Sequence, residues 1–258
     1  MPDAGNTVGM RKGHENDPVG AGQPGPRFVT SLARTASEVR EAQRLRHLVF
    51  AEELGARLDS AAERLDRDRF DDYCAHLLVR SADTGEVVGT YRILTAANAR
   101  RAGGFYSEQE FDLGAIPSLP RVVEIGRACV HPDHRGGAVL ALLWGALAQH
   151  FRLHGYEHVI GCASLPAREN PGGVASVCDR LLREHGTAPL WRASPRRPFD
   201  ASPSVSRVPI PAAIRGYLHM GAEVCSEPAW DPDFGTADVL LLLSIANLNG
   251  RWARRLLR

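Results

Sequence analysis

The chain has 258 residues, a formal net charge of +1, 44% hydrophobic residues and 24% charged residues. This is the balance of an ordinary globular protein, and so small a net charge excludes a general attraction to nucleic acid. No secretory signal is evident, and the longest apolar run, residues 138–148, is too short to cross a bilayer. Five widely spaced cysteines without a CxxC pair argue against a disulfide framework and a zinc site. We therefore expect a cytoplasmic protein with reduced thiols.

Residues 1–27 are rich in glycine, proline and polar residues, and such a segment buries too little apolar surface to order itself. The composition predicts a disordered N-terminal tail over 1–27. It is followed by a single domain over 28–258, because no repeat or linker divides the rest of the chain.

Helix and strand signals begin after the tail. Thr35 and Glu38 have the spacing of a capping box and open a helix whose apolar residues recur to Leu54, before Gly55. Residues 74–94 predict two strands joined by a turn at 83–85, and residues 103–113 predict a loop with a short helix.

The second half alternates strands and helices. A strand at 122–130 leads to a helix at 136–154, a strand at 156–164 and a helix at 171–185. After a Pro- and Arg-rich loop come a short helix at 211–221, strands at 222–227 and 236–245, and a basic helix at the end. This order predicts an α/β protein with a mixed central sheet flanked by helices.

The strand VVEIGRACV, residues 122–130, carries an ionisable pair in an apolar setting. Simple alternation would place Glu124 and Arg127 on opposite faces of the sheet. A glycine inside a strand often marks a bulge, and a bulge at Gly126 would bring the two side chains together and free backbone groups for a ligand. A satisfied salt bridge, or Arg127 exposed at a sheet edge, explains the pair equally well.

The turn that follows the strand, HPDHRGG, opens a long helix whose N-terminal amides would attract a phosphate. This layout resembles the cofactor-binding segment of GNAT acyltransferases, which usually reads R/Q-x-x-G-x-G/A. Here Ala138 and Leu140 replace the two later small positions, which favours the single phosphate of a phosphopantetheine arm over the pyrophosphate of coenzyme A. The resemblance implies a donor site at Gly126, Ala128, Val130, Arg135, Gly136 and Gly137.

Six blocks along residues 43–243 closely resemble the bacterial ornithine N-acyltransferases. They are QRLRHLVFAEELGA, DRDRFDDYCAHLLV, VVGTYRIL, GFYSEQEFDL, VEIGRACVHPDHRGG and EPAWDPDFGTADVLLLL. Arg46, Asp68, Asp71, Arg92 and Glu124-x-x-Arg127 also resemble the pattern of acyl-homoserine-lactone synthases. The resemblance implies a GNAT-like fold with a mostly antiparallel, twisted sheet. It also implies transfer of a 3-hydroxyacyl chain from acyl carrier protein to the α-amine of L-ornithine.

In that reaction Glu124 would act as the general base, because a carboxylate on an apolar strand should have a raised pKa. Arg127 and Arg92 would orient Glu124 or hold the carboxylate of the amino acid. Arg46, Asp68 and Asp71 would bind substrate or form an ion network, and the sequence supports both roles equally. A nucleophile among Cys129, His131 and His134 has little support, because no third orienting group is evident.

Ornithine has a second, cationic amine, so its pocket should contain acids. Candidates are Glu108, Glu110, Asp231, Asp233 and Asp238, of which Glu108 and Asp238 are preferred; exposed loop acids remain the simpler explanation for any one of them.

We expect no permanently bound cofactor or metal, with acyl-phosphopantetheine as a co-substrate. Arginines at 100–101, 135 and 196–197 could guide the acidic acyl carrier protein, and the terminal RWARRLLR could touch anionic lipid. The alternatives are another amine acceptor, an acetyl-CoA-dependent acetyltransferase and a non-catalytic module that binds a carrier protein.

Overall fold

The computed structural model describes residues 27–205 and 208–249. The predicted tail and the terminal basic segment therefore lie almost wholly outside the described residues. No helix within the described ranges is long and apolar enough to span a membrane.

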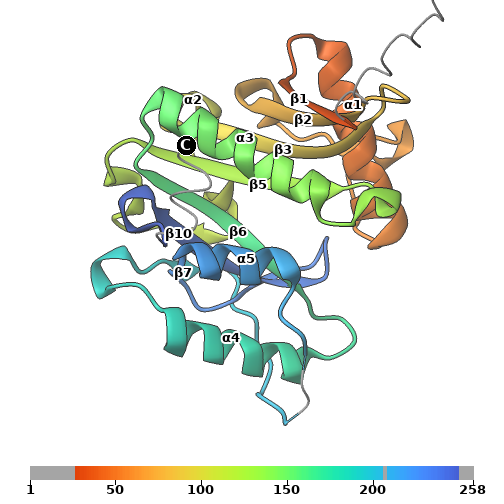
Figure 1. The fold of residues 1–258 in the computed structure, drawn as a ribbon. Coiled ribbons are helices and arrows are strands. Elements are labelled where there is room, and N and C mark those ends of the chain that lie inside the picture. The colour runs from red at the N-terminus through yellow and green to blue at the C-terminus, as the bar shows by residue number, and fades with distance from the viewer. Residues whose placement is uncertain (1–26, 206–207, 250–258) are drawn as a thin grey trace, which may run out of the picture.

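One eight-stranded sheet organises the fold, in the order β1-β2-β3-β5-β6-β10-β8, with β9 also paired to β10 (Figure 1). Only β5 and β6 pair in parallel, so the predicted mixed and mostly antiparallel sheet is confirmed. The strands are β1 Phe28–Leu32, β2 Ala75–Ser81, β3 Val87–Thr95, β5 Val122–Val130, β6 His158–Pro166, β8 Glu223–Val224, β9 Ala229–Asp231 and β10 Thr236–Ser244. A separate short pair joins β4 Phe111–Asp112 to β7 Ser194–Pro195.

In the described part of the chain, five α-helices flank the sheet: α1 Ala36–His47, α2 Ala96–Ala102, α3 Ala138–His154, α4 Pro171–His185 and α5 Ala212–Met220. The predicted capping box of α1 is present, since Thr35 and Glu38 each accept from the other's backbone N–H. The sequence predicted that this helix continues to residue 54. In the structure α1 ends at His47, and Leu48–Glu53 forms a π-helix. The wider π turn carries Phe50 and Glu53, which both reappear near the functional site.

The apolar residues of β10 alternate between two cores, as strand geometry requires. Val239 and Leu241 belong to a core shared with α4 and α5, while Leu240 and Leu242 belong to a core on the opposite face. On β2 and β3, α3 packs over the first of these faces, and α1 and α2 lie on the second. The sheet is thus covered on both sides.

Strand β1 was not predicted. Its sequence, FVTSL, has four of five residues exposed and lacks an apolar alternation, because it pairs only with β2 at the edge of the sheet. Edge strands owe their conformation to backbone pairing with a neighbour, which leaves little trace in a local sequence pattern.

The parallel strands β5 and β6 form a fork (Figure 1). They pair only from Val122–Glu124 against His158–Ile160, although both strands continue well beyond these residues. A Cβ atom at Gly161 would lie 2.5 Å from the backbone oxygen of Ile125, so only glycine allows the two chains to approach this closely where they begin to part. The fork opens a passage through the middle of the sheet.

Candidate active site

A β-bulge interrupts β5 beside the fork. Thr90 pairs with Cys129, whereas Arg92 pairs with Gly126, so two residues of β5, Arg127 and Ala128, stand opposite Tyr91. Arg127 has a φ of 49°, in the left-handed region that residues with a side chain seldom adopt. The bulge predicted at Gly126 is confirmed, and it leaves backbone groups outside the regular ladder.

The bulge places Glu124 and Arg127 on one face of the sheet, where both contact Tyr106. The backbone N–H of Tyr106 donates to Glu124 Oε2 at 2.6 Å, and Arg127 Nη1 donates to the Tyr106 hydroxyl at 3.2 Å. The N–H of Ser107 donates to the other oxygen of Glu124 at 2.8 Å. Burial raises the pKa of Glu124 despite these amides, which confirms the direction expected from the sequence.

Arg46 forms the centre of a buried ion network. It is fully buried, donates to both carboxylate oxygens of Asp71 at 2.9 and 2.8 Å, and lies 2.9 Å from the carboxylate of Asp66. The guanidinium groups of Arg46 and Arg92 hold the pKa of Asp71 well below its ordinary range, although burial opposes them. Gln43 adds a further hydrogen bond to Asp71, at 3.1 Å.

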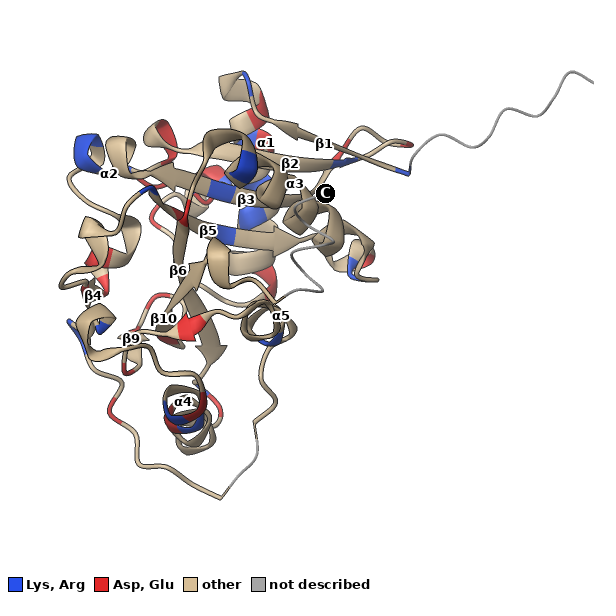
Figure 2. Cartoon of the chain, turned by 60° about the vertical axis from the view of Figure 1, so that its left-hand side comes forward, with Lys and Arg blue, Asp and Glu red and all other residues tan. Residues whose placement is uncertain are grey.

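Two more arginines, on β3 and β5, complete this network near the centre of the sheet (Figure 2). Arg92 donates to both oxygens of Asp68 at 2.7 Å and to Asp71 at 3.3 Å. Arg127 lies 3.2 Å from the carboxylate of Asp66 and 3.4 Å from that of Asp68. Three arginines therefore face three aspartates. We call Arg46, Arg92, Arg127, Asp66, Asp68 and Asp71 the Arg–Asp network.

A cavity of about 280 Å³ passes through the fork. Ile125–Ala128 of β5 and Gly161–Ser164 of β6 line it from its two sides. Arg92 and Arg127 are the members of the network that reach its wall, whereas Arg46, Asp68 and Asp71 do not line it. The structure thus places these last three predicted substrate contacts behind the wall. There Asp68 and Asp71 pair with the two arginines, and Arg46 pairs with Asp71.

Three carboxylates gather at one end of the cavity. The side chains of Glu110, Asp231 and Asp238 all line it, and carboxylate oxygens of the three lie within 4.8 Å of one another. We call these residues the acid cluster. Outside the cluster, no N–H or O–H group of residues 27–205 and 208–249 donates to Glu110, whereas the Ser164 hydroxyl donates to Asp238 at 3.0 Å.

The acid cluster has unusual electrostatics. Burial and the neighbouring acids Asp238 and Asp231 raise the pKa of Glu110 well above its ordinary value. Burial also raises the pKa of Asp238 to about 6. Glu110 and Asp238 therefore resist ionisation, and a cation beside them would favour their charged forms. Their spacing would suit either an ammonium group or a divalent metal ion.

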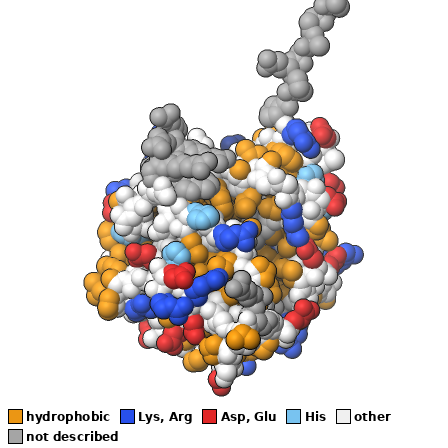
Figure 3. Space-filling model, turned by 60° about the horizontal axis from the view of Figure 1, so that its bottom comes forward, with side chains coloured by type: hydrophobic (Ala, Val, Ile, Leu, Met, Phe, Trp, Pro, Cys, Tyr) orange, Lys and Arg blue, Asp and Glu red, His pale blue; other side chains and the backbone are white. Residues whose placement is uncertain are grey.

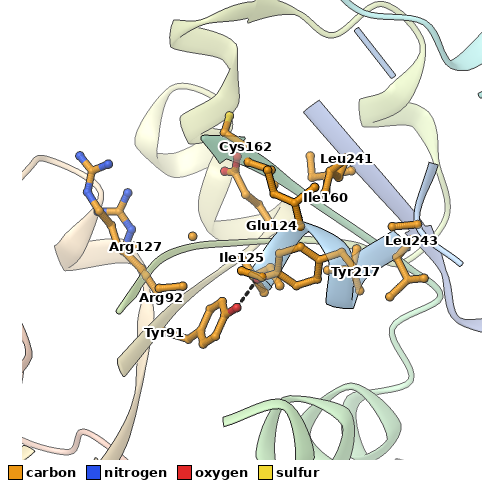
Figure 4. Close-up of a pocket in the computed structure, with 18 of the residues that line it drawn as sticks. Tyr91, Arg92, Glu124, Ile125, Arg127, Ile160, Cys162, Tyr217, Leu241 and Leu243 are labelled. Atoms are coloured by element: carbon orange, nitrogen blue, oxygen red, sulfur yellow. Dashed lines mark hydrogen bonds between the residues drawn. The ribbon is translucent and has the colours of Figure 1, made fainter. Parts of the chain in front are cut away.

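The other end of the cavity is apolar. Its wall includes Leu147 and Phe151 of α3, Met220 of α5, and Leu241 and Leu243 of β10. Figure 4 shows Arg92 and Arg127 together on one side, Glu124 pointing toward Cys162, and Leu241 and Leu243 on the opposite side. The cavity thus connects a region lined by charged side chains to a region lined by apolar side chains, and the bulge lies between the two regions.

The turn before α3 is open to solvent. Arg135, Gly136 and Gly137 are all exposed, Gly137 has a φ of 90°, and no side chain caps the first turn of α3. Arg135 itself already makes a two-pronged ion pair with Glu53 and donates to the Val130 carbonyl at 3.2 Å. The helix amides remain available to an anion, while the Arg135 side chain has a protein partner.

Among the predicted acids, the geometry favours Glu110 over Glu108. Glu108 accepts the N–H of Phe105 at 3.3 Å as a helix cap and does not line the cavity, whereas Glu110 does. Asp233 is exposed, near Arg57. Asp66, Tyr91, Tyr106 and Tyr217 were not predicted as site residues. Asp66 lies in the same acidic block as Asp68, but spacing alone could not indicate which carboxylates turn inward.

The thiols near the site are poor nucleophiles. Burial raises the pKa of Cys129 to about 12, and burial with nearby acids raises the pKa of Cys162 well above its ordinary value. Both therefore stay protonated at neutral pH. This geometry suits direct attack by an amine on a bound acyl group.

Comparisons with known proteins concern the family and the fold. Residues 45–145 match the family described as "Acetyltransferase (GNAT) domain". The fold is also similar to that of a CoA-dependent acyl-homoserine lactone synthase, BjaI, with a TM-score of 0.52, 16% identity, and coverage of 86% of this chain and 81% of that one.

Curated relatives are closer in sequence. The chain is 37% identical to the L-ornithine N(alpha)-acyltransferase of Rhodobacter capsulatus over 235 residues, covering 84% of this chain and 89% of that protein. It is 34% identical to the protein of the same name from Brucella abortus over 242 residues, covering 86% and 85%. The chain therefore belongs to the L-ornithine N(alpha)-acyltransferase family of GNAT-fold proteins.

Proposed function

We propose that this protein transfers a long acyl chain from a thioester to the α-amine of L-ornithine. The observation that carries this proposal is the single cavity that has carboxylates at one end, an apolar pocket at the other and a β-bulge between them. A product made of an acyl chain joined to a cationic amino acid has the same division of polarity. Family membership supports the same acceptor.

The acceptor has three charged groups, and the cavity offers a partner for each type. The acid cluster would receive the side-chain ammonium of ornithine. Arg92 and Arg127, whose guanidinium groups reach the cavity wall, would hold its carboxylate. The α-amine would then lie near Glu124, between these two anchors.

In the reaction, Glu124 would accept a proton from the α-ammonium, directly or through a water molecule. Each carboxylate oxygen of Glu124 accepts one amide N–H and keeps a second lone pair for this purpose. The free amine attacks the thioester carbon, the C–N bond forms, and the C–S bond breaks. Amides at the bulge would stabilise the carbonyl oxygen as it gains charge, and the departing thiolate would take up a proton.

For the donor we propose an acyl carrier protein, whose phosphopantetheine phosphate would bind the first amides of α3. Gly136 and Gly137 leave open space there, since a Cβ at either position would meet no atom within 4 Å. On the face seen in Figure 3, basic side chains form separate small groups with acidic ones beside most of them. Docking would therefore use a few local contacts.

A mass-spectrometric transfer assay tests the proposal. The protein would be mixed with 3-hydroxyacyl carrier protein, and separately with acyl-CoA or acetyl-CoA, together with ornithine, lysine and other amines. We expect 3-hydroxyacyl-ornithine from the carrier-protein donor. Acylation of another amine in place of ornithine would show that the proposed acceptor is wrong. Turnover of acetyl-CoA alone would show that the proposed donor is wrong.

A metal-dependent reaction is the competing use of the acid cluster. Repeating the assay with EDTA separates the two uses, because an ammonium site works without metal. Loss of activity with EDTA and recovery with a divalent cation would assign the cluster to a metal instead.

A further inference from the structure

Two tyrosine hydroxyls meet in the apolar part of the cavity. The hydroxyl of Tyr91, on β3, is hydrogen-bonded to that of Tyr217, on α5, and both residues line the cavity (Figure 4). Tyr91 is buried, and its side chain lies on the sheet face that α3 covers. Buried polar groups in an apolar wall are costly unless all their hydrogen-bonding capacity is used.

The two tyrosine hydroxyls cannot use all of their hydrogen-bonding capacity on each other. Burial raises the pKa of both Tyr91 and Tyr217, so each keeps its proton. One hydroxyl can donate to the other. The remaining polar neighbour of the pair in the described chain is the indole N–H of Trp144, which is also a donor. One O–H hydrogen is therefore left without an acceptor among residues 27–205 and 208–249 and is available to a ligand oxygen.

The position of the pair relates it to the thioester. Tyr91 stands directly opposite the bulge residues Arg127 and Ala128 across the sheet ladder. Figure 4 shows the two tyrosines meeting beside Ile125, one residue before Gly126. A chain whose carbonyl lies at the bulge and whose tail enters the apolar pocket would pass the tyrosine pair within its first few carbon atoms.

We propose that Tyr91 and Tyr217 recognise a hydroxyl group carried by the acyl chain close to its thioester carbonyl, and so select hydroxylated over unsubstituted acyl donors. This inference rests on the proposed acyl transfer and adds the residues that set donor specificity. An unsubstituted chain would bury the pair without giving it an acceptor. A site built to hydrogen-bond a hydroxyl disfavours the analogue that lacks it for this reason.

The pair is held firmly by its surroundings. The rings of Trp144 and Tyr217 lie 5.9 Å apart, and Trp144 packs so closely on Gly216 that a Cβ at Gly216 would come within 2.1 Å of the indole. Gly216 therefore lets α3 and α5 approach and fixes the indole beside the two hydroxyls. A fixed arrangement is what selection for one substituent position needs.

A competition assay tests the inference. Carrier proteins loaded with 3-hydroxyacyl and unsubstituted acyl chains of equal length are mixed in equal amounts with ornithine, and the ratio of the two products is measured. The wild-type protein should favour the hydroxylated chain. In the double variant Tyr91→Phe/Tyr217→Phe the ratio should fall by about 3- to 10-fold, which is the effect of one hydrogen bond.

The double variant is chosen because either hydroxyl alone could still donate. Removing both partners with similarly shaped side chains also limits the effect on folding, which thermal unfolding would check. Tyr156→Phe is the matched control: this residue packs on Phe151, outside the cavity, and its loss of a hydroxyl should leave the ratio unchanged. An unchanged ratio in the double variant, or no preference in the wild type, would overturn the inference.

A binding measurement separates this inference from the proposed function. Calorimetry with 3-hydroxydodecanoate and dodecanoate requires neither ornithine nor turnover. Tighter binding of the hydroxy acid by the wild type, and equal binding of both acids by the double variant, would support the tyrosine pair even if no acyl-ornithine formed. Equal binding by the wild type would overturn it even if ornithine were acylated.

Discussion

Two groups of charged side chains, the Arg–Asp network and the acid cluster, flank the bulge. They differ in the presence of counter-ions. In the Arg–Asp network, three aspartates face three arginines, and the pKa of Asp71 lies well below its ordinary range. In the acid cluster, three carboxylates face one another, and the pKa values of Glu110 and Asp238 are raised. Asp71 and Asp238 are the same type of side chain, so their environments set the opposite shifts in pKa.

The difference indicates what each group is for. A set of charges that is balanced within the protein contributes mainly shape and positioning, and only its members that reach the cavity wall, Arg92 and Arg127, can also contact a ligand. A set of like charges that lines a cavity destabilises the free protein, because the charges repel one another. A cationic ligand can remove this destabilisation. On this basis we expect the network to support the site and the acid cluster to bind the acceptor.

The largest effect should come from unbalancing the network. Asp71→Asn removes the carboxylate that pairs with Arg46 and leaves a fully buried guanidinium without its main partner. We expect the free energy of unfolding to fall by about 3–5 kcal/mol. Denaturant unfolding measures this.

Glu63→Gln serves as the control for that loss, because it breaks the exposed pair of Glu63 with Arg67. Its effect should stay below about 0.5 kcal/mol. A similarly small effect of Asp71→Asn would mean that the network does not hold the fold and that Asp71 is free for another role.

Glu124 combines features of both groups, and its substitution should have the largest effect on catalysis. Its oxygens are capped by amides, as in a structural carboxylate, yet its pKa is raised by burial. Glu124→Gln should lower kcat by about 100- to 10,000-fold, the usual contribution of a general base. Single-turnover kinetics across pH provides the measurement.

The pH profile separates the two possible roles of Glu124. A base gives a rate that rises with pH through the raised pKa of Glu124 in the wild type. In Glu124→Gln this rise is absent, and only the titration of the α-amine of ornithine remains. If the variant keeps the wild-type profile at a lower amplitude, Glu124 acts by positioning the Tyr106–Ser107 turn instead.

Sequence patterns predicted the backbone elements around this site better than they predicted the positions of its charged side chains. The bulge followed from one glycine within an apolar strand, and helix α4 spans Pro171–His185, the range that the sequence predicted. Local signals of this kind need no knowledge of distant residues. The fork between β5 and β6 was missed, because it depends on how far two strands stay paired.

The charged groups could not be assigned from sequence for a similar reason. Asp66 and Asp68 are two residues apart and both join the network, while Glu108 and Glu110 are also two residues apart and only Glu110 reaches the cavity. Which carboxylate turns inward depends on partners supplied by remote strands. Burial and pairing, and not residue type, distinguish a substrate contact from a positioning group.

A substitution within the acid cluster should affect the stability of the free protein in the opposite direction to Asp71→Asn. Asp238→Asn removes one of three mutually repelling carboxylates, so the free protein should be as stable as the wild type or more stable. The KM for ornithine should nevertheless rise by about 10- to 100-fold, as expected for loss of a charge-assisted contact. Steady-state kinetics with varied ornithine would show this.

The matched control for Asp238 is Asp233→Asn, in the same stretch of chain. Asp233 is exposed, so its loss should leave the KM unchanged. If Asp238→Asn lowered stability and left the KM unchanged, the cluster would be structural, and the contrast between the two groups would fail.

The smallest effect concerns pH, and it has opposite signs in the two groups. Asp238 has a pKa of about 6 in the folded protein, above its ordinary value of 3.8, so the folded state holds a proton that the unfolded state releases earlier. The stability it contributes is complete below pH 3.8 and is lost as the pH rises through about 6. The lowered pKa of Asp71 acts in reverse, since its contribution is lost only as the pH falls below the ordinary aspartate range. Unfolding curves between pH 4 and pH 7 should therefore show a decline in the wild type that Asp238→Asn reduces, while Glu110 and Glu124, whose pKa values are also raised, retain part of it. Saturating ornithine should also reduce it, because a bound ammonium group favours the ionised carboxylates. A decline of unchanged size in Asp238→Asn would assign the titration to other groups and remove the electrostatic argument for a cation site.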